Sequence, residues 1–180
     1  MISQRTKEVV AGNLGLSVSD LTDQFYRVVN EDLTTRDGFT HKLGVEAVDP
    51  KWNPDPSIDC GEGLHVVWGH PFLVLAFCIR NNPRFFKLPE GTTRVLVPSH
   101  DSDGKFRTEA ITLLAENELG EDAPEFDQGV LLKIAKSDYS YRVRMAAVDK
   151  ITDRKVLTYI AKNDYSWQVQ VAASLRLRSL

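Results

Sequence analysis

The sequence is poor in cysteine and has no long apolar segment. Its 180 residues include two cysteines, Cys60 and Cys78, which are too few for a disulfide scaffold and are expected to be reduced. No run of about 18 apolar residues is present, so we expect no membrane-spanning helix and no membrane partner. The N-terminal residues lack the apolar core of a secretory signal. These absences predict a cytoplasmic protein.

Two common nucleotide-binding motifs are also absent. The sequence has no Gly-x-x-x-x-Gly-Lys loop, whose backbone would bind phosphates, and no glycine-rich dinucleotide fingerprint. Because both motifs are absent, neither gives reason to expect a nucleotide cofactor. We expect no cofactor.

Neither sign of charge dominates the chain, whose net charge is −3, but its two halves differ. Residues 1–129 hold 12 Lys and Arg against 21 Asp and Glu, whereas residues 130–180 hold 10 against 4. Such an asymmetry fits a surface for nucleic acid or acidic protein, and it equally fits two halves that dock on each other. We favour solvation or docking within the molecule, because the positive excess is modest for a nucleic-acid binder.

The C-terminal part contains an internal repeat. Residues 130–140 recur as residues 156–166, and the same offset of 26 residues relates Val143, Ala146 and Ala147 to Val169, Ala172 and Ala173. A fixed period of this size is typical of stacked supersecondary units, none of which buries its apolar face alone. Apolar spacing predicts two short helices per unit, at 128–136 and 142–151 in the first.

Residues 138–148 and 164–175 resemble the second-helix signature of HEAT-like repeats: an Asp, a short turn, a Val-Arg pair and two alanines. The short period is also similar to variant leucine-rich repeats of bacteria. The resemblance implies that the Asp and the Arg are mostly scaffold. Arg144 fits this pattern, whereas Gln170 stands at the equivalent position of the second repeat.

Two repeats are fewer than a stable array usually needs, so both ends of the stack require cover. We expect the N-terminal half to cover one end. The other end, residues 174–180, continues in a helical pattern without a polar cap. We expect it either to mediate homo-oligomer formation or partner binding, or to be a frayed last helix.

Residues 1–120 predict an α+β domain, with its core at about 24–116, and an acidic linker follows at 116–128. The whole chain is then a small, mostly antiparallel sheet domain followed by two HEAT-like helical-hairpin repeats at 128–180. The expected elements of the first domain are strands at 25–29, 64–68, 93–97 and 107–114, a buried helix at 71–79, a weak helix at 4–12 and a loop at 49–56.

Residues 26–29, 33–39 and 60–65 resemble a bacterial domain of unknown function that precedes pentapeptide or helical repeats. The segment 61–66 also resembles the Gly-x-Gly-Ile-Tyr-Phe segment of ADP-ribosyltransferases. That second resemblance implies an NAD-using enzyme, active or decayed, with Arg27, His65 and Glu109 in catalytic positions. His65 departs from the tyrosine of that family, and no Ser-Thr-Ser strand is present.

Cysteine and histidine side chains offer two further hypotheses. Cys60, His65, His70 and Cys78 are residue types that bind zinc, and a histidine beside Cys60 would activate it as a nucleophile. A glycine turn separates Cys60 from His65, and Cys78 lies in an apolar segment. We therefore favour inert, buried cysteines and expect no metal site.

The role that the sequence favours is a non-enzymatic module that binds a protein partner through the repeat surface. The residues expected at the rim of that surface are Tyr141, Arg142, Arg144, Trp167 and Gln168. Whether the protein is an enzyme stays open at this point, with the answer leaning to no.

A nucleic-acid partner is the second alternative. Aromatic residues alternate with cations in both repeats, at Tyr139, Tyr141, Tyr165 and Trp167, and such patterns can stack bases and neutralise phosphates. We favour packing between repeats, because aromatic residues at equivalent positions are what stacking predicts.

Overall fold

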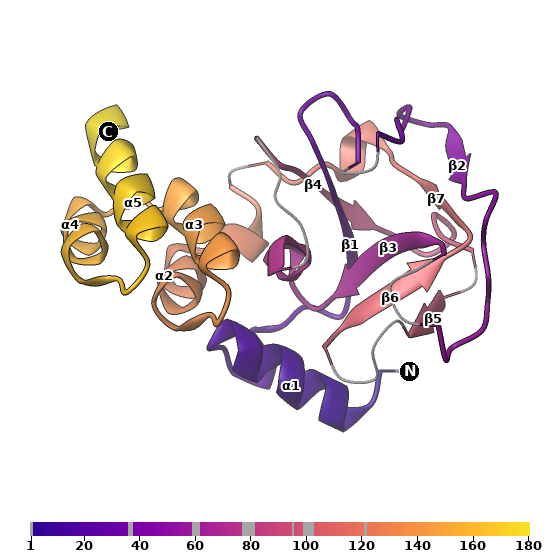
Figure 1. Ribbon diagram of the computed structural model, residues 1–180, viewed down its shortest axis with the longest axis horizontal. Helices are drawn as coiled ribbons and strands as arrows, with labels where there is room; N and C mark the ends of the chain where they lie inside the picture. The colour runs from indigo at the N-terminus through magenta and orange to yellow at the C-terminus, as the bar shows by residue number, and fades with distance from the viewer. Residues whose placement is uncertain are drawn as a thin grey trace.

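The computed structural model describes residues 2–35, 38–58, 62–76, 82–94, 96–98, 103–120 and 122–180 (Figure 1). The predicted α+β class is confirmed: an antiparallel sheet forms one end of the molecule and four helices form the other. Both cysteines, and residues 77–79 of the expected helix at 71–79, lie outside the described residues.

The main sheet has five strands in the order β4-β1-β3-β6-β5, and every pairing is antiparallel. A two-stranded sheet, β2 with β7, lies beside it. The strands are β1 Phe25–Val29, β2 Glu46–Val48, β3 Leu64–Trp68, β4 Arg84–Leu88, β5 Leu96–Pro98, β6 Lys105–Thr108 and β7 Ala110–Thr112.

The main sheet is buried on both faces. Tyr26 and Val28 of β1 belong to the larger apolar cluster, whereas Val29 belongs to a smaller cluster completed by β2 and β7. A short 3-10 helix, η2 Pro71–Ala76, packs on the first face with Phe72 fully buried. It forms the first part of the buried helix predicted at 71–79.

The first helix, α1 Gln4–Leu14, runs past the predicted end at Gly12. Ser3 caps its start by accepting a hydrogen bond from the Thr6 amide at 3.1 Å. Gly15 ends it with a φ of 68°, a left-handed conformation that favours glycine. A Cβ at Gly15 would lie 2.3 Å from the Cβ of Ser137, so the glycine also permits close contact between α1 and the hairpins.

The C-terminal part forms two helical hairpins with the expected offset of 26 residues. The first is α2 Gln128–Ser137 with α3 Tyr141–Lys150, and the second is α4 Arg154–Asn163 with α5 Trp167–Ser179. Asp127 caps α2 and Asp153 caps α4. Each aspartate accepts hydrogen bonds from the backbone amides two and three residues later, at 2.8 and 3.2 Å. The repeated sequence therefore encodes a repeated local structure.

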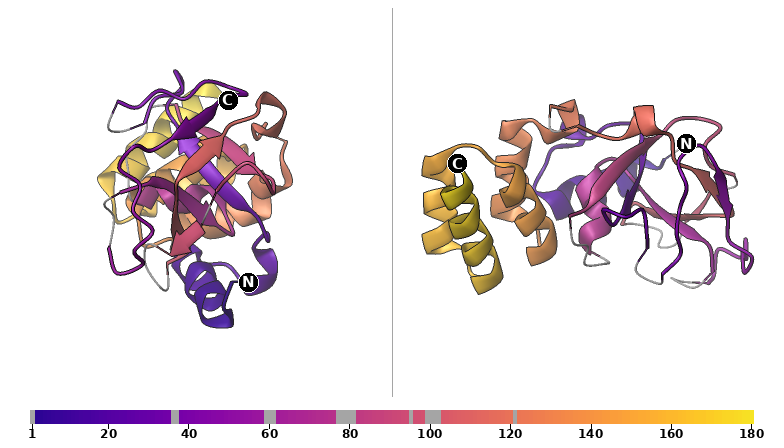
Figure 2. Two further views of the ribbon diagram at one scale, coloured as in Figure 1. Left: turned by 90° about the vertical axis from the view of Figure 1, so that its right-hand side faces the viewer. Right: turned by 90° about the horizontal axis from the view of Figure 1, so that it is seen from above.

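The sheet and the hairpins lie next to each other along the molecule (Figure 2). One apolar cluster runs through both parts. It extends from Val10 and Leu14 of α1 through Phe72 and Phe85 to the hairpins. The expected linker contributes to it through η4 Pro124–Phe126, whose Phe126 ring stacks on Phe72 at 5.3 Å. The N-terminal part thus covers the first hairpin, as expected, by sharing a core with it.

Candidate functional site: the junction between sheet and hairpins

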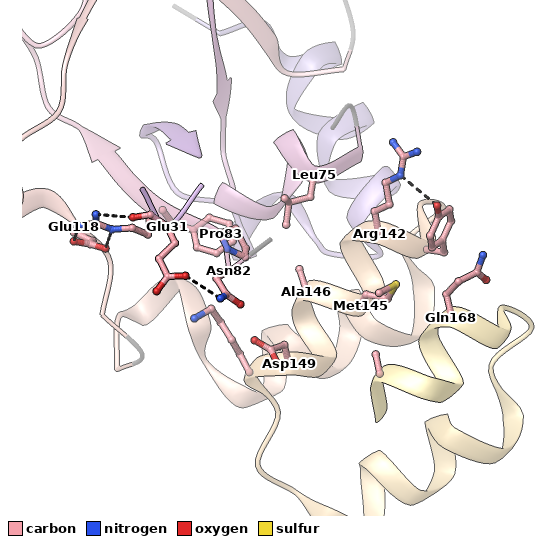
Figure 3. A pocket seen from close by; sticks show the side chains of 15 residues that line it. Glu31, Leu75, Asn82, Pro83, Glu118, Arg142, Met145, Ala146, Asp149 and Gln168 are labelled. Carbon is pink, nitrogen blue, oxygen red and sulfur yellow. Dashed lines mark hydrogen bonds and ion pairs between the residues drawn. The ribbon is translucent and has the colours of Figure 1, made fainter. Parts of the chain in front are cut away.

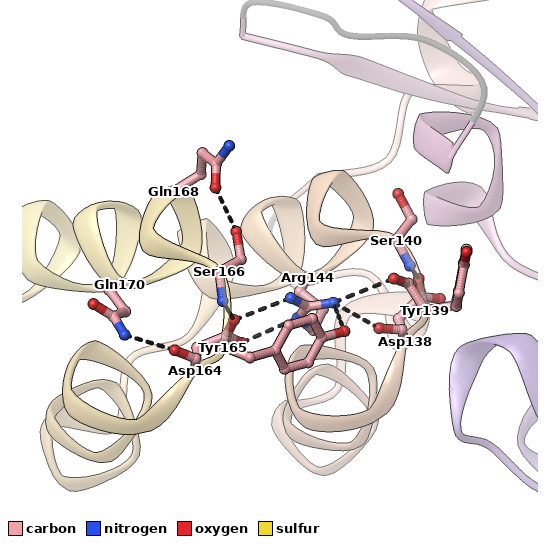
Figure 4. Close-up of polar contacts among 9 residues, drawn as sticks. All are labelled: Asp138, Tyr139, Ser140, Arg144, Asp164, Tyr165, Ser166, Gln168 and Gln170. Carbon is pink, nitrogen blue, oxygen red and sulfur yellow. Dashed lines mark hydrogen bonds and ion pairs between the residues drawn. The ribbon is translucent and has the colours of Figure 1, made fainter.

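Arg144 on α3 is the central polar residue of the hairpins (Figure 4). Its side chain is fully buried, and its Nε and Nη2 each donate to the Asp164 carboxylate at 3.0 Å. Nη1 donates to the Asp138 carbonyl at 2.9 Å and to the Tyr165 hydroxyl. The prediction that Arg144 lies on a partner-binding rim is wrong, because these internal contacts enclose it completely.

The second hairpin reproduces only half of this arrangement. Gln170 donates to the carbonyl of Asp164 at 2.6 Å, as Arg144 does to the carbonyl of Asp138. In both turns the aspartate Oδ1 accepts a 2.7 Å hydrogen bond from the amide two residues later. Arg144 therefore links one hairpin to the next, whereas Gln170 makes only the contact within its own hairpin.

Asp138 and Asp164 occupy equivalent positions with different surroundings. Asp164 faces the Arg144 guanidinium directly, but Asp138 is buried with the Ser140 amide as its hydrogen-bond donor. Burial raises the pKa of Asp138 to about 7, and the Ser140 hydrogen bond and the charge of Arg144 only partly oppose this.

A cleft of about 1120 Å³ lies where the sheet meets the hairpins (Figure 3). We call it the junction cleft. Its helical wall comes from α3 and α5 and includes Tyr141, Arg142, Met145, Lys150 and Gln168. Three of the five predicted partner-binding residues, Tyr141, Arg142 and Gln168, are thus brought to one cleft.

The sheet wall of the junction cleft is held by paired charges. Arg84 on β4 donates two hydrogen bonds of 2.7 Å to the Glu118 carboxylate and a third, of 3.2 Å, to the carbonyl of Glu31. Asn82 donates to the Glu31 carboxylate at 3.0 Å. These side chains already satisfy one another, so this wall is pre-formed.

The cations of the helical wall contact aromatic rings instead of carboxylates. The guanidinium of Arg142 lies 5.6 Å from the ring centre of Tyr141, and the ammonium of Lys150 lies 4.5 Å from that of Phe126. Within the described part of the chain no ion pair joins either side chain to a carboxylate. The helical wall therefore presents the cations of Arg142 and Lys150 to the cleft, together with one carboxylate, that of Asp149.

Trp167 does not line the junction cleft but begins an exposed apolar row on α5. Trp167, Val171 and Leu175 are 68%, 47% and 58% exposed, and their spacing of four residues places them on one helix face. We call these three residues the α5 stripe. The repeat pattern indicated Trp167 alone, although the spacing of the other two is visible in the sequence.

The three residues of the transferase hypothesis lie among internal contacts of the sheet domain. Arg27 on β1 is buried, donates to the His65 carbonyl and lies 3.5 Å from Nε2 of His41. Burial, followed by the charges of Lys105, Arg27 and Arg107, lowers the pKa of His65 to about 4. Glu109 lies at the bend between β6 and β7, 3.8 Å from Arg94.

Arg107 on β6 is a structural residue that the sequence did not reveal. Its fully buried guanidinium donates to the carbonyls of Asn53, Asp55 and Glu62 at 3.1, 2.7 and 2.6 Å. It also lies 5.8 Å from a ring of Trp52. Arg107 thereby fixes the proline-containing loop, which lacks a regular hydrogen-bond ladder, to the sheet.

His70, from the zinc hypothesis, belongs to a buried polar group beneath η4. Its Nδ1 accepts from the Phe72 amide at 3.2 Å, and its Nε2 lies 3.1 Å from the Glu125 carbonyl. Burial lowers its pKa to about 4. Cys60 and Cys78 lie outside the described residues, and within those that are described no three potential metal ligands gather.

Comparison with known proteins gives no family for this chain: no family model, curated protein or solved structure matches it. Among the described residues, no helix is long and apolar enough to cross a membrane.

Proposed function

We propose that the protein is a non-enzymatic module that binds a protein partner at the junction cleft and the adjoining face of α5. The observation that carries this proposal is the position of Arg142 and Lys150. Both side chains are half-buried in an open cleft, and each makes a cation-π contact with an aromatic ring. Neither side chain takes part in the polar network of Arg144 that links the hairpins.

The repeat scaffold supports the proposal by separating two sets of residues. Arg144, Asp164 and Gln170 are used inside the hairpins. Tyr141, Arg142 and Gln168 line the cleft, and Trp167 is exposed beside it. Aromatic and arginine side chains of this kind dominate binding energy at protein interfaces.

The test is capture of a partner from cell lysate with tagged full-length protein, followed by mass spectrometry. The variant is Arg142→Glu, and the matched control is Lys155→Glu, which makes the same charge change at an exposed position of α4. We expect Arg142→Glu to reduce capture about tenfold or more, because it places a carboxylate where a cation faces the partner. We expect Lys155→Glu to leave capture unchanged.

Both variants should unfold at the temperature of the wild type, because neither residue forms an ion pair within the described part of the chain. Equal loss of capture in both variants would contradict the proposal, since it would indicate a general charge effect. Recovery of nucleic acid whose binding falls steeply with added salt would contradict it as well.

A further inference from the structure

We propose that the α5 stripe docks an amphipathic helix of a partner protein, with Asp or Glu residues flanking the apolar face of that helix. This inference rests on the proposed function and names the class of partner. Trp167, Val171 and Leu175 form a continuous apolar row about 12 Å long, at the rise of 1.5 Å per residue of a helix.

The fold does not require the stripe to be apolar. α5 packs against its neighbours through the opposite side, where Val169 and Ala173 are fully buried. At the positions equivalent to Trp167, Val171 and Leu175, the first hairpin has Tyr141, Met145 and Asp149, all of which line the junction cleft. The stripe therefore continues the cleft-lining face of α3 onto α5 and leaves it uncovered.

A further stacked hairpin is a poor occupant, because the end of the second hairpin is polar. Val148 is fully buried in the first hairpin, but its equivalent in the second is Ser174. Leu132 is replaced in the same way by Thr158. Ser174 and Thr158 line a pocket at this end with Arg154 and Arg178, and two leucines, Leu177 and Leu180, complete its largely polar lining. A polar outer face is typical of a capping repeat and not of one that continues an array.

Charge also opposes a second copy of the chain as the occupant. α5 carries Arg178 on the side of the stripe and no acidic residue, and its Arg176 donates to the Ile151 carbonyl within the molecule. Two α5 helices packed stripe to stripe would therefore offer Arg178 no carboxylate from either helix. A partner helix with carboxylates beside its apolar residues would meet Arg178 on α5 and, at the cleft, Arg142.

A helix matches the shape of the stripe. Side chains at i, i+4 and i+8 form a ridge, and such ridges pack into the grooves between side chains of another helix. Recognition of an amphipathic helix by anchors of this spacing is a recurrent mode of binding.

The test uses a display library of random 16-residue peptides selected on immobilised full-length protein. We expect enriched peptides to carry a net negative charge and apolar residues spaced by three or four. In solution they should bind with an increase in helicity seen by circular dichroism. Trp167→Ala should weaken binding about tenfold or more, as expected of an anchor residue. Leu175→Ala should weaken it less, because it removes a smaller contact area.

The matched control is Tyr159→Ala, which removes another exposed aromatic ring, from α4, and should not change peptide binding. Basic peptides, peptides without the apolar spacing, peptides insensitive to Trp167→Ala or no enrichment at all would each overturn the inference. A dimer of the free protein that Trp167→Ala dissociates would overturn it in favour of a second copy.

The two proposals fail differently. A partner captured from lysate in a manner that depends on Arg142 but not on Trp167 would leave the proposed function standing and reject the acidic helix. Capture of a partner that depends on neither Arg142 nor Trp167 would reject both proposals.

Discussion

At the scale of single residues, Arg144 and Arg142 divide the hairpins into a scaffold and a surface. They lie two positions apart on α3, yet Arg144 is fully buried and Arg142 lines the junction cleft. The alternating exposure follows from helix geometry, since residues two apart point in different directions. A variant at one position therefore reports on stability and a variant at the other on binding.

Arg144→Gln is expected to reduce stability strongly. A glutamine at position 144 can still donate to the Asp138 carbonyl, as Gln170 donates to the Asp164 carbonyl in the second hairpin, but it leaves the Asp164 carboxylate without its cation. Removing one member of a buried ion pair typically costs about 3–5 kcal/mol. Urea denaturation monitored by circular dichroism measures this free energy. An unchanged midpoint would show that Arg144 does not link the hairpins.

Asp138 gives the hairpins a pH dependence whose sign is fixed by its raised pKa. The pKa of about 7 in the folded state exceeds the ordinary value of 3.8, so the folded protein retains a proton that the unfolded chain loses. The corresponding stability is fully present below pH 3.8 and is lost as the pH rises through 7. Its magnitude is at most about 4 kcal/mol, at 1.36 kcal/mol for each pKa unit.

Asp138→Asn tests this linkage, because an amide does not titrate. We expect the stability of the variant, relative to the wild type, to rise between pH 4 and pH 7. The comparison must be relative, since burial lowers the pKa of His41 to about 3 and those of His65 and His70 to about 4. These three histidines make both proteins less stable as the pH falls below 6.5. Parallel pH profiles for the two proteins would contradict the assigned role of Asp138.

At the scale of elements, the sequence pattern predicted the strands and hairpins whose formation depends on neighbouring residues. The apolar runs at 25–29 and 64–68 formed β1 and β3 with the predicted bounds, and the repeat formed two hairpins at the predicted offset. β4 was missed because Arg84 and Lys87 interrupt its apolar residues. Their charges are balanced by Glu118 and Glu125, which are distant in sequence. Partners at such separations leave no local signal.

Two glycines near the end of α1 have opposite expected effects when replaced. Gly12 is helical, and a Cβ added there would meet no atom within 4 Å, so Gly12→Ala should stabilise the protein by about 0.5–1 kcal/mol. Gly15 has a φ of 68° and touches Ser137, so Gly15→Ala should destabilise it by about 1–3 kcal/mol. Thermal unfolding of both variants checks the pair. Equal shifts would show that α1 does not pack on the hairpins as described.

At the scale of the whole molecule, the shared core decides how the protein can be tested. Phe72 and Phe85 pack on Phe126, and all three belong to the cluster that includes the hairpins. Removing residues 128–180 would expose this surface, so a truncated chain would confuse loss of folding with loss of binding. Point variants of the full chain avoid that difficulty.

The candidate site could be predicted only in part for the same reason. The repeat pattern identified Tyr141, Arg142, Trp167 and Gln168, because equivalent positions in the two units can be compared directly. It misplaced Arg144, because the buried pair with Asp164 depends on how two hairpins stack. The sheet wall of the junction cleft could not be predicted from the sequence, because it meets α3 only through packing between residues that are distant along the chain.

The most direct test of the central claim is hydrogen–deuterium exchange of the full chain with and without the captured partner. We predict slower exchange at 141–150 of α3 and 167–175 of α5, with the loop at 49–58 unchanged. Protection confined to that loop or to the sheet, with α3 and α5 unaffected, would contradict the proposed binding surface.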